Sequence, residues 1–264
     1  MLHAAHPRTD TPMPTIRPGA GRQGLAAFRP QICLPQIVAE AAAVHGPAPA
    51  FAGPAGCTSY AAFGADLARY ARYAEAEGFG SGNTVALLMR HGPASLALWL
   101  GFALAGARVA LVDASLSGAC LARTLASLAP RLLVADPDCA EGVQALAALI
   151  PEMPAVRWHG PGADFARIDI EAAEYEGEEL AGPGEVGADD AALLACSGHR
   201  GAAPTVAAAS HRQILAWAQG ASLGLPRAIE VCPAEFRAVA EACGVLLRGG
   251  VVVVESGPRP GTLC

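Results

Sequence analysis

The sequence contains no lysine, and all 18 of its basic residues are arginine. Lysine is ordinarily among the commonest residues of a protein, so its absence is a strong deviation in composition. Biased codon usage explains the absence most simply, because the chain is rich in alanine, glycine, proline and arginine. Whatever its origin, it excludes any mechanism for which this chain alone must supply a lysine side chain.

The sequence also lacks the cysteine spacing of a metal site. None of its eight cysteines forms a C-x-x-C motif or a cluster with histidine, which excludes the common zinc-binding patterns. The cysteines are scattered through apolar segments, which is typical of reduced, buried thiols and predicts a cytoplasmic protein. They stand at positions 33, 57, 120, 139, 196, 232, 243 and 264.

Positive net charge and long apolar runs are missing as well. A formal net charge of -6 argues against a nucleic-acid partner, which would normally require a basic surface. The longest apolar run, at residues 93–107, is too short to cross a bilayer, so no transmembrane segment is expected. The first thirty residues lack the apolar centre of a signal peptide. Peripheral contact with a membrane surface remains open.

Short apolar runs alternate with segments of helical spacing from residue 84 onward. Unbroken apolar strands separated by helices are typical of parallel sheets covered on both faces. The sequence therefore predicts an α/β fold with mostly parallel, doubly wound sheets and flanking helices. Strands are predicted at 85–89, 109–112, 132–135, 155–158, 191–196, 228–232 and 251–255. Helices are predicted at 35–45, 60–78 (with a Ser59 cap), 93–105, after Ser117, and at 140–149, 210–223 and 234–247.

Changes in composition divide the chain into five parts. Residues 1–30 are rich in proline and lack apolar periodicity, so we expect a disordered leader. Residues 31–160 and 191–257 each form one α/β subdomain of βα repeats, and 161–190 is an acidic, Gly/Pro-rich connection. Residues 258–264 are a tail without pattern. Because the last strand precedes this tail, a protein partner could cover the carboxy-terminal sheet edge.

One segment, residues 193–205, has the pattern of a phosphate-binding loop. An apolar strand enters a Ser-Gly-x-x-Gly turn, whose small residues would let backbone N–H groups approach an anion near the start of the helix expected from Ser210. The glycines at 78–82 have the opposite context, because they end a helix and lead into a strand, which predicts a helix cap and turn. A serine-hydrolase nucleophile at Ser197 is disfavoured because Ala195 replaces the first glycine of G-x-S-x-G.

Several collinear segments together resemble the amino-terminal part of AMP-forming acyl-CoA synthetases, and within that superfamily the fatty acid transport protein type. They are Val-Ala-Leu-Leu-Met at 85–89, Leu-Trp-Leu-Gly at 98–101, and the segment at 190–198, which stands where the family has the strand that leads into its T-S-G-T-T-G-x-P-K motif. The segment at 210–217 is similar to S-H-R-x-x-x-x-W. The resemblance covers roughly residues 45–257.

This resemblance implies a fold and a ligand. The family binds ATP, with Mg²⁺, at this loop and forms an acyl-adenylate and then an acyl-CoA from a fatty acid. The matching nucleotide-binding positions here are Ser197, Gly198, His199, Arg200, Gly201 and Thr205. His199 and Arg200 replace two threonines, and Thr205 stands where the family has a lysine. Phe236 replaces a family histidine. No catalytic residue and no metal ligand is assigned.

The departures from the family pattern favour a truncated, degenerate synthetase-like pseudoenzyme of fatty acid metabolism without adenylating activity of its own. Two alternatives remain open: one half of a split acyl-CoA ligase, or an unrelated doubly wound α/β binding protein. A fatty acid or an acyl-adenylate is the small-molecule ligand that the resemblance implies.

Overall fold

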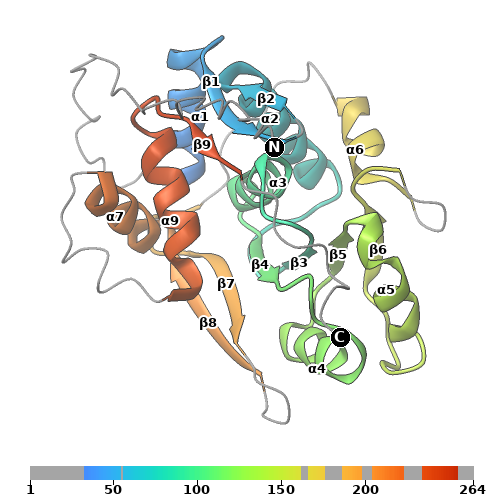
Figure 1. Ribbon diagram of the computed structural model, residues 1–264. Coiled ribbons are helices and arrows are strands. Elements are labelled where there is room, and N and C mark those ends of the chain that lie inside the picture. Colours follow the sequence, from blue (N-terminus) through green and yellow to red (C-terminus); the bar gives the residue numbers. More distant parts are fainter. Residues whose placement is uncertain are drawn as a thin grey trace, which may run out of the picture.

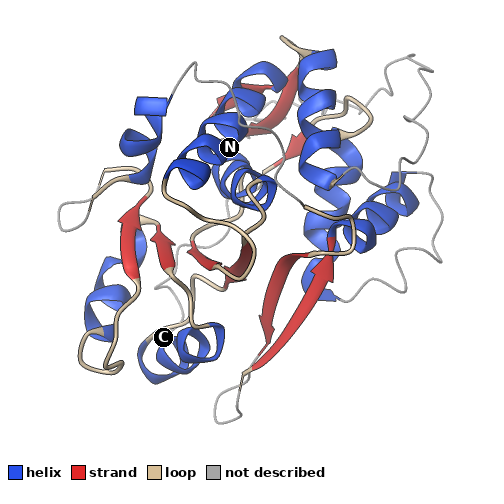
Figure 2. Ribbon diagram, turned by 180° about the vertical axis from the view of Figure 1, so that it is seen from behind, coloured by secondary structure: helices blue, strands red, loops and turns tan. Residues whose placement is uncertain are grey.

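The structure is a computed structural model that describes residues 33–54, 56–161, 166–175, 186–197, 204–222 and 234–254. The expected leader, the strand predicted at 228–232 and the tail lie outside these residues. Helices pack on both sides of a central sheet, and a smaller sheet lies at one end of the molecule (Figures 1 and 2).

The central sheet has six strands in the order β6-β5-β3-β4-β7-β8. The first five run parallel to their neighbours and β8 runs antiparallel to β7, which confirms the mostly parallel α/β fold. The strands are β3 (Thr84–Leu88), β4 (Arg108–Val112), β5 (Leu132–Ala135), β6 (Ala155–Trp158), β7 (Ala191–Ser197) and β8 (Thr205–Ser210).

Two hydrophobic clusters cover the two faces of this sheet. Successive side chains of β3 point alternately to the two faces. Val85 and Leu87 belong to one cluster, and Ala86 and Leu88 belong to the other. All residues of β3 and β5 are buried, which explains why their sequences read as unbroken apolar runs. The first cluster includes residues of α1 (Leu34–His45), α2 (Tyr60–Ala76), α3 (Pro93–Leu104), α7 (His211–Ser222) and α9 (Ala234–Leu246); the second includes α4 (Gly118–Leu128) and α5 (Ala140–Leu146).

Helix α2 begins and ends as the sequence predicts. The hydroxyl of Ser59 accepts the N–H of Ala62 at 3.1 Å, which caps the helix start. Gly78 follows the helix with φ +66°, a conformation that favours glycine. Arg131 donates to the carbonyl oxygens of Glu77 and Gly78, at 2.7 and 2.8 Å, and its guanidinium lies 4.2 Å from the centre of the Phe79 ring. The glycine-rich segment at 78–82 is therefore a cap and turn.

A second, three-stranded sheet was only partly predicted. Its order is β2-β1-β9, with β1 (Pro49–Gly53) antiparallel to β2 (Gly56–Ser59) and parallel to β9 (Val252–Val253). The hydroxyl of Tyr60 donates to the carbonyl oxygens of Leu246 and Gly250, at 3.0 and 2.7 Å, and so joins this sheet to the end of α9. Strands β1 and β2 escaped prediction because both are short and contain glycine or proline.

Strand β8 was not predicted from the sequence. Residues 205–210 lack the alternation of a strand, yet they pair with β7 from Ser197↔Thr205 to Ala191↔Ser210. Strand β7 also pairs with β4, so one sheet continues from residues 84–158 into 191–210. The division into subdomains at 31–160 and 191–257, with a connection at 161–190, stays a prediction.

Three short helical segments lie between β5 and β7, in addition to α5 and β6. They are a 3₁₀ turn (Pro137–Cys139), α6 (Ile168–Glu171) and a second 3₁₀ turn (Ala172–Tyr175). Glu171 accepts hydrogen bonds from the Arg157 side chain at 2.7 Å and from the Tyr73 hydroxyl at 3.1 Å. This part of the expected acidic connection is thus fastened to β6 and α2.

Candidate functional site at the β7–β8 hairpin

The candidate site lies at the carboxyl end of β7, at the edge of the sheet where parallel strands end. Ligands of α/β proteins commonly bind at this edge. Ser197 and Thr205 are opposite each other as the last residue of β7 and the first of β8. They close the predicted loop, whose residues 198–203, including Gly198, His199, Arg200 and Gly201, lie outside the described part of the chain. In Figure 1 the hairpin projects from the body of the molecule.

Helix α7 begins at the opposite end of this hairpin, which corrects the expectation of a loop beside a helix start. Ser210 pairs with Ala191 at the base, and α7 follows immediately. The Ser210 N–H donates to Gln213 Oε1 at 2.9 Å, and the Gln213 N–H donates to Ser210 Oγ at 3.3 Å, a reciprocal cap. Thr205 and Ser210 are the first and last residues of β8, five residue steps apart, which is a distance of about 17 Å. The α7 dipole therefore lies too far away to hold an anion at the loop.

His211, the first residue of α7, is buried at the same base. Its side chain is 2% exposed, and its Nδ1 has no hydrogen-bond partner within the described part of the chain. Desolvation lowers the pKa of His211 to about 4, although the nearby Asp190 carboxylate opposes the shift. His211 is therefore neutral at physiological pH and remote from the loop, so it is not a general base there.

The cysteine on the strand that enters the loop is not an activated nucleophile. Cys196, one residue before Ser197, is half-buried, and burial raises the pKa of its thiol. A thiol with a raised pKa is protonated at neutral pH and is a poor nucleophile. Covalent catalysis by Cys196 is therefore disfavoured.

A second polar cluster at the same sheet edge escaped the sequence analysis. The Arg90 N–H donates to Asp136 Oδ2 at 2.8 Å, and the Arg90 guanidinium pairs with Asp138 at 3.1 Å. Burial raises the pKa of the Asp136 carboxyl despite this hydrogen bond. The His159 Nε2 lies 3.2 Å from the Tyr70 hydroxyl. The sequence does contain a signal for this cluster, because a polar residue closely follows each of the strands β3, β5 and β6.

Phe236, which replaces a histidine of the family motif, lies in the core. Its side chain is 1% exposed and stacks on Trp217, with ring centres 5.9 Å apart. This contact joins α9 to α7. In this protein the position therefore serves packing between two helices.

Within the ranges that the structure describes, no group of three or more His, Cys, Asp or Glu side chains could hold a metal ion. No helix in these ranges is long and apolar enough to cross a membrane.

Comparison with known proteins identifies the family. A family model described as AMP-binding enzyme matches residues 38–261, which is most of the chain. The chain belongs to this family. The match excludes the alternative of an unrelated α/β protein.

Relatives of this AMP-binding family member include human long-chain fatty acid transport protein 3. It is 38% identical over 104 residues, which are 37% of this chain and 14% of that protein. The inhibitor-bound N-terminal domain of FACL13 from Mycobacterium tuberculosis shares the fold with a TM-score of 0.68 at 20% identity, over 85% of this chain and 57% of that one. The anthranilate CoA ligase AuaEII in complex with anthranoyl-AMP matches with a TM-score of 0.65 at 13% identity. The match covers 76% of this chain and 38% of that one. The chain thus spans little more than half the length of these proteins at most.

Proposed function

We propose that this chain binds the phosphates of an adenine nucleotide, ATP or AMP, at residues 197–205, and that it does not form an acyl-adenylate by itself. The observation that carries the proposal is the pairing of Ser197 with Thr205 at the carboxyl edge of the sheet in an AMP-binding fold. This pairing brings the two ends of a Ser-Gly-x-x-Gly turn together, and such turns can direct backbone N–H groups at an anion.

The missing charge supports the second half of the proposal. Catalysis on phosphates depends mainly on positioning and on neutralising developing charge. The family has a lysine where this chain has Thr205, and the chain contains no lysine anywhere. Arg200 adds a cation to the loop sequence, but a planar guanidinium does not replace an ammonium point charge. We therefore expect binding to persist and adenylation to be absent.

The second ligand of the proposal is a fatty acid or its acyl-adenylate, and Mg²⁺ would arrive with ATP as part of the substrate complex. The AuaEII complex contains an acyl-AMP, and the human relative is named for long-chain fatty acids. These ligands are taken from the relatives' names. A cytoplasmic location, with peripheral membrane contact as the alternative, belongs to the same proposal.

Titration calorimetry with ATP, AMP and a non-hydrolysable acyl-adenylate analogue tests the binding. Changing Gly198 and Gly201 together to valine should weaken binding at least tenfold, because side chains would block the backbone approach. Gly142→Val in α5 is the matched control, since a Cβ there has no neighbour within 4 Å. Undiminished binding by the double variant would exclude the loop, and no binding by the wild type would refute the function.

ATP–pyrophosphate exchange with fatty acids tests the absence of adenylation. The purified chain should give no exchange above background. Robust exchange by the chain alone would refute this half of the proposal.

A second candidate function is one half of a split acyl-CoA ligase. Strand β8 favours it, because β8 has a neighbouring strand on only one side among the described strands, and Val206 on it is 41% exposed. In the described part of the smaller sheet, β9 is likewise an outer strand, and its Val253 is 63% exposed, so a protein partner could pair there. Exchange activity that appears only after a second polypeptide is added would establish this alternative.

A further inference from the structure

Strand β7 contains one residue more than the strand opposite it. Ala191 pairs with Ser210 and Leu193 with Ala209, so β7 advances by two residues while β8 advances by one. On the other side, the pairing with β4 begins only at Leu193. Ala192 therefore has no pairing partner in either neighbouring strand. It is the extra residue of a β-bulge.

The hydrophobic clusters record the same bulge. Side chains normally alternate between the faces of a strand, and β7 alternates from Leu193 to Cys196. Ala192, however, lies in the same cluster as Leu193 rather than with Leu194. The bulge thus sets which residues of β7 face which cluster. Removal of the bulge would shift the pairing register of β7 and β8 by one residue.

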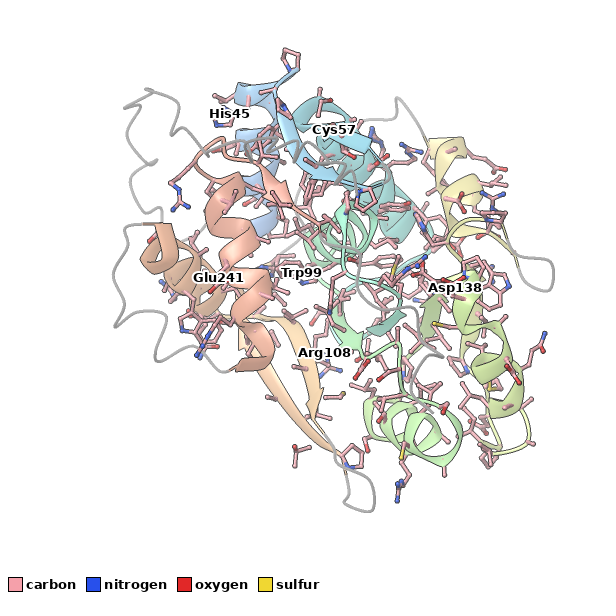
Figure 3. The ribbon with its side chains drawn as sticks, in the orientation of Figure 1. His45, Cys57, Trp99, Arg108, Asp138 and Glu241 are labelled. Atoms are coloured by element: carbon pink, nitrogen blue, oxygen red, sulfur yellow. The ribbon has the colours of Figure 1, made fainter. Side chains whose placement is uncertain are left out.

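A tryptophan of α3 satisfies the backbone of this bulge. The indole Nε1–H of Trp99 donates to the Ala192 carbonyl oxygen at 3.0 Å. Trp99 is 1% exposed and Ala192 is fully buried, so solvent does not supply another donor. A buried carbonyl oxygen that loses its hydrogen-bond donor destabilises the fold. Trp99 lies near the middle of the molecule (Figure 3).

We propose that Trp99 is a positioning residue: its indole N–H holds the bulge at Ala192 and thereby fixes the register in which Ser197 and Thr205 close the loop. The role of the loop in nucleotide binding rests on the proposed function, whereas the effect on the hairpin does not. Trp99 touches no ligand in this scheme and acts through β7.

The test replaces Trp99 with phenylalanine, which keeps an aromatic ring and removes the N–H donor. The matched control is Trp158→Phe, because Trp158 is equally buried but lies on β6, the strand farthest from the hairpin in the sheet. Both variants are studied at a temperature at which they are fully folded. Amide hydrogen exchange and cross-strand NOEs between residues 197 and 205 report the hairpin, and calorimetry reports ATP affinity.

In W99F we expect the β7 and β8 amides to exchange about tenfold faster, the 197–205 NOEs to weaken, and ATP to bind about tenfold more weakly. W158F should leave all three unchanged. Equal hairpin protection and intact NOEs in both variants would overturn the proposal. A disturbed hairpin in W99F, in a protein whose wild type binds no nucleotide, would support the role of Trp99 and refute the proposed function.

The wild-type protein gives a second measurement if W99F does not fold. The indole N–H of Trp99 should exchange with solvent at the rate of the Leu193 and Leu194 amides, because one opening event releases all of them. Exchange at least tenfold faster than these amides would overturn the proposal.

Discussion

At the carboxyl ends of the parallel strands, the polar residues after β3, β5 and β6 differ in role from those after β7. At β3 and β5, Arg90 and Asp136 bind each other, and beyond β6 Asp169 accepts the Gly160 N–H at 3.1 Å. Strand β7 instead ends at Ser197, and the sequence beyond it is Gly-His-Arg-Gly-Ala-Ala, in which small residues flank His199 and Arg200. Polar groups that bind one another hold an edge together, whereas small residues leave backbone groups accessible. The difference teaches that polar residues after strands do not by themselves identify a ligand site.

The contact between α2 and α3 should be the part of the molecule where a substitution lowers the free energy of unfolding most. Gly101 of α3 lies against α2, and a Cβ there would be 2.9 Å from the backbone nitrogen of Ala71. Gly101→Val should lower the free energy of unfolding by more than about 3 kcal/mol, because backbone atoms must move. Urea denaturation measures the loss, and Gly142→Val in α5 is the control. Similar stability of the two variants would contradict the close helix contact.

The base of the hairpin should respond to pH. His211 has an unfolded pKa of 6.5 and a folded pKa of about 4. Above pH 6.5 it is neutral in both states. Between pH 6.5 and 4 only the unfolded chain takes up the proton, so stability should fall by about 3 kcal/mol and then level off.

Denaturant unfolding of His211→Gln and of wild type across pH 7 to 4 measures this contribution as a difference. The exposed His91, changed to glutamine, serves as the control and should follow the wild type. An H211Q curve parallel to that of wild type would show that the burial of His211 has no such effect.

The polar residues after β3 and β5 should serve stability and not binding. Asp136→Ala removes the acceptor of the Arg90 N–H and should lower the free energy of unfolding by about 2 kcal/mol. Asp138→Ala removes only an exposed ion pair and should cost less than about 0.5 kcal/mol. ATP affinity should stay unchanged in both. Loss of ATP binding in folded D136A would move the ligand site to the β3–β5 end.

A lysine at position 205, where the family has one, should increase the affinity of the loop for ATP. Thr205 is exposed, so Thr205→Lys can be accommodated at the start of β8. We expect ATP to bind about tenfold more tightly, or about 1.4 kcal/mol, with an advantage that shrinks at high salt. Thr205→Met is the uncharged control for calorimetry. An equal gain from methionine would indicate that charge is not what the loop lacks.

Much of the fold was predictable because its signals are local. The buried strands β3 to β6 have apolar runs bounded by turns, and β5 was predicted at its observed bounds. The start of α2 followed from Ser59, whose cap involves neighbours in the sequence. Strands β1, β2 and β8 were missed because short or alanine-rich segments carry no period. Of the candidate site, the sequence located the segment and the structure describes the pairing of Ser197 with Thr205.

The sequence by itself determined the alternation of strands and helices, the family, and the absence of a lysine from the loop, because these are properties of neighbouring residues. Only the tertiary structure decided the rest. Strand β8 exists because β7 offers it an edge, and α7 consequently begins at the far end of the hairpin. The Ala192 carbonyl at the bulge accepts its hydrogen bond from Trp99, 93 positions earlier. Contacts between residues so far apart in the chain leave no local pattern, so they become visible only when the chain is folded.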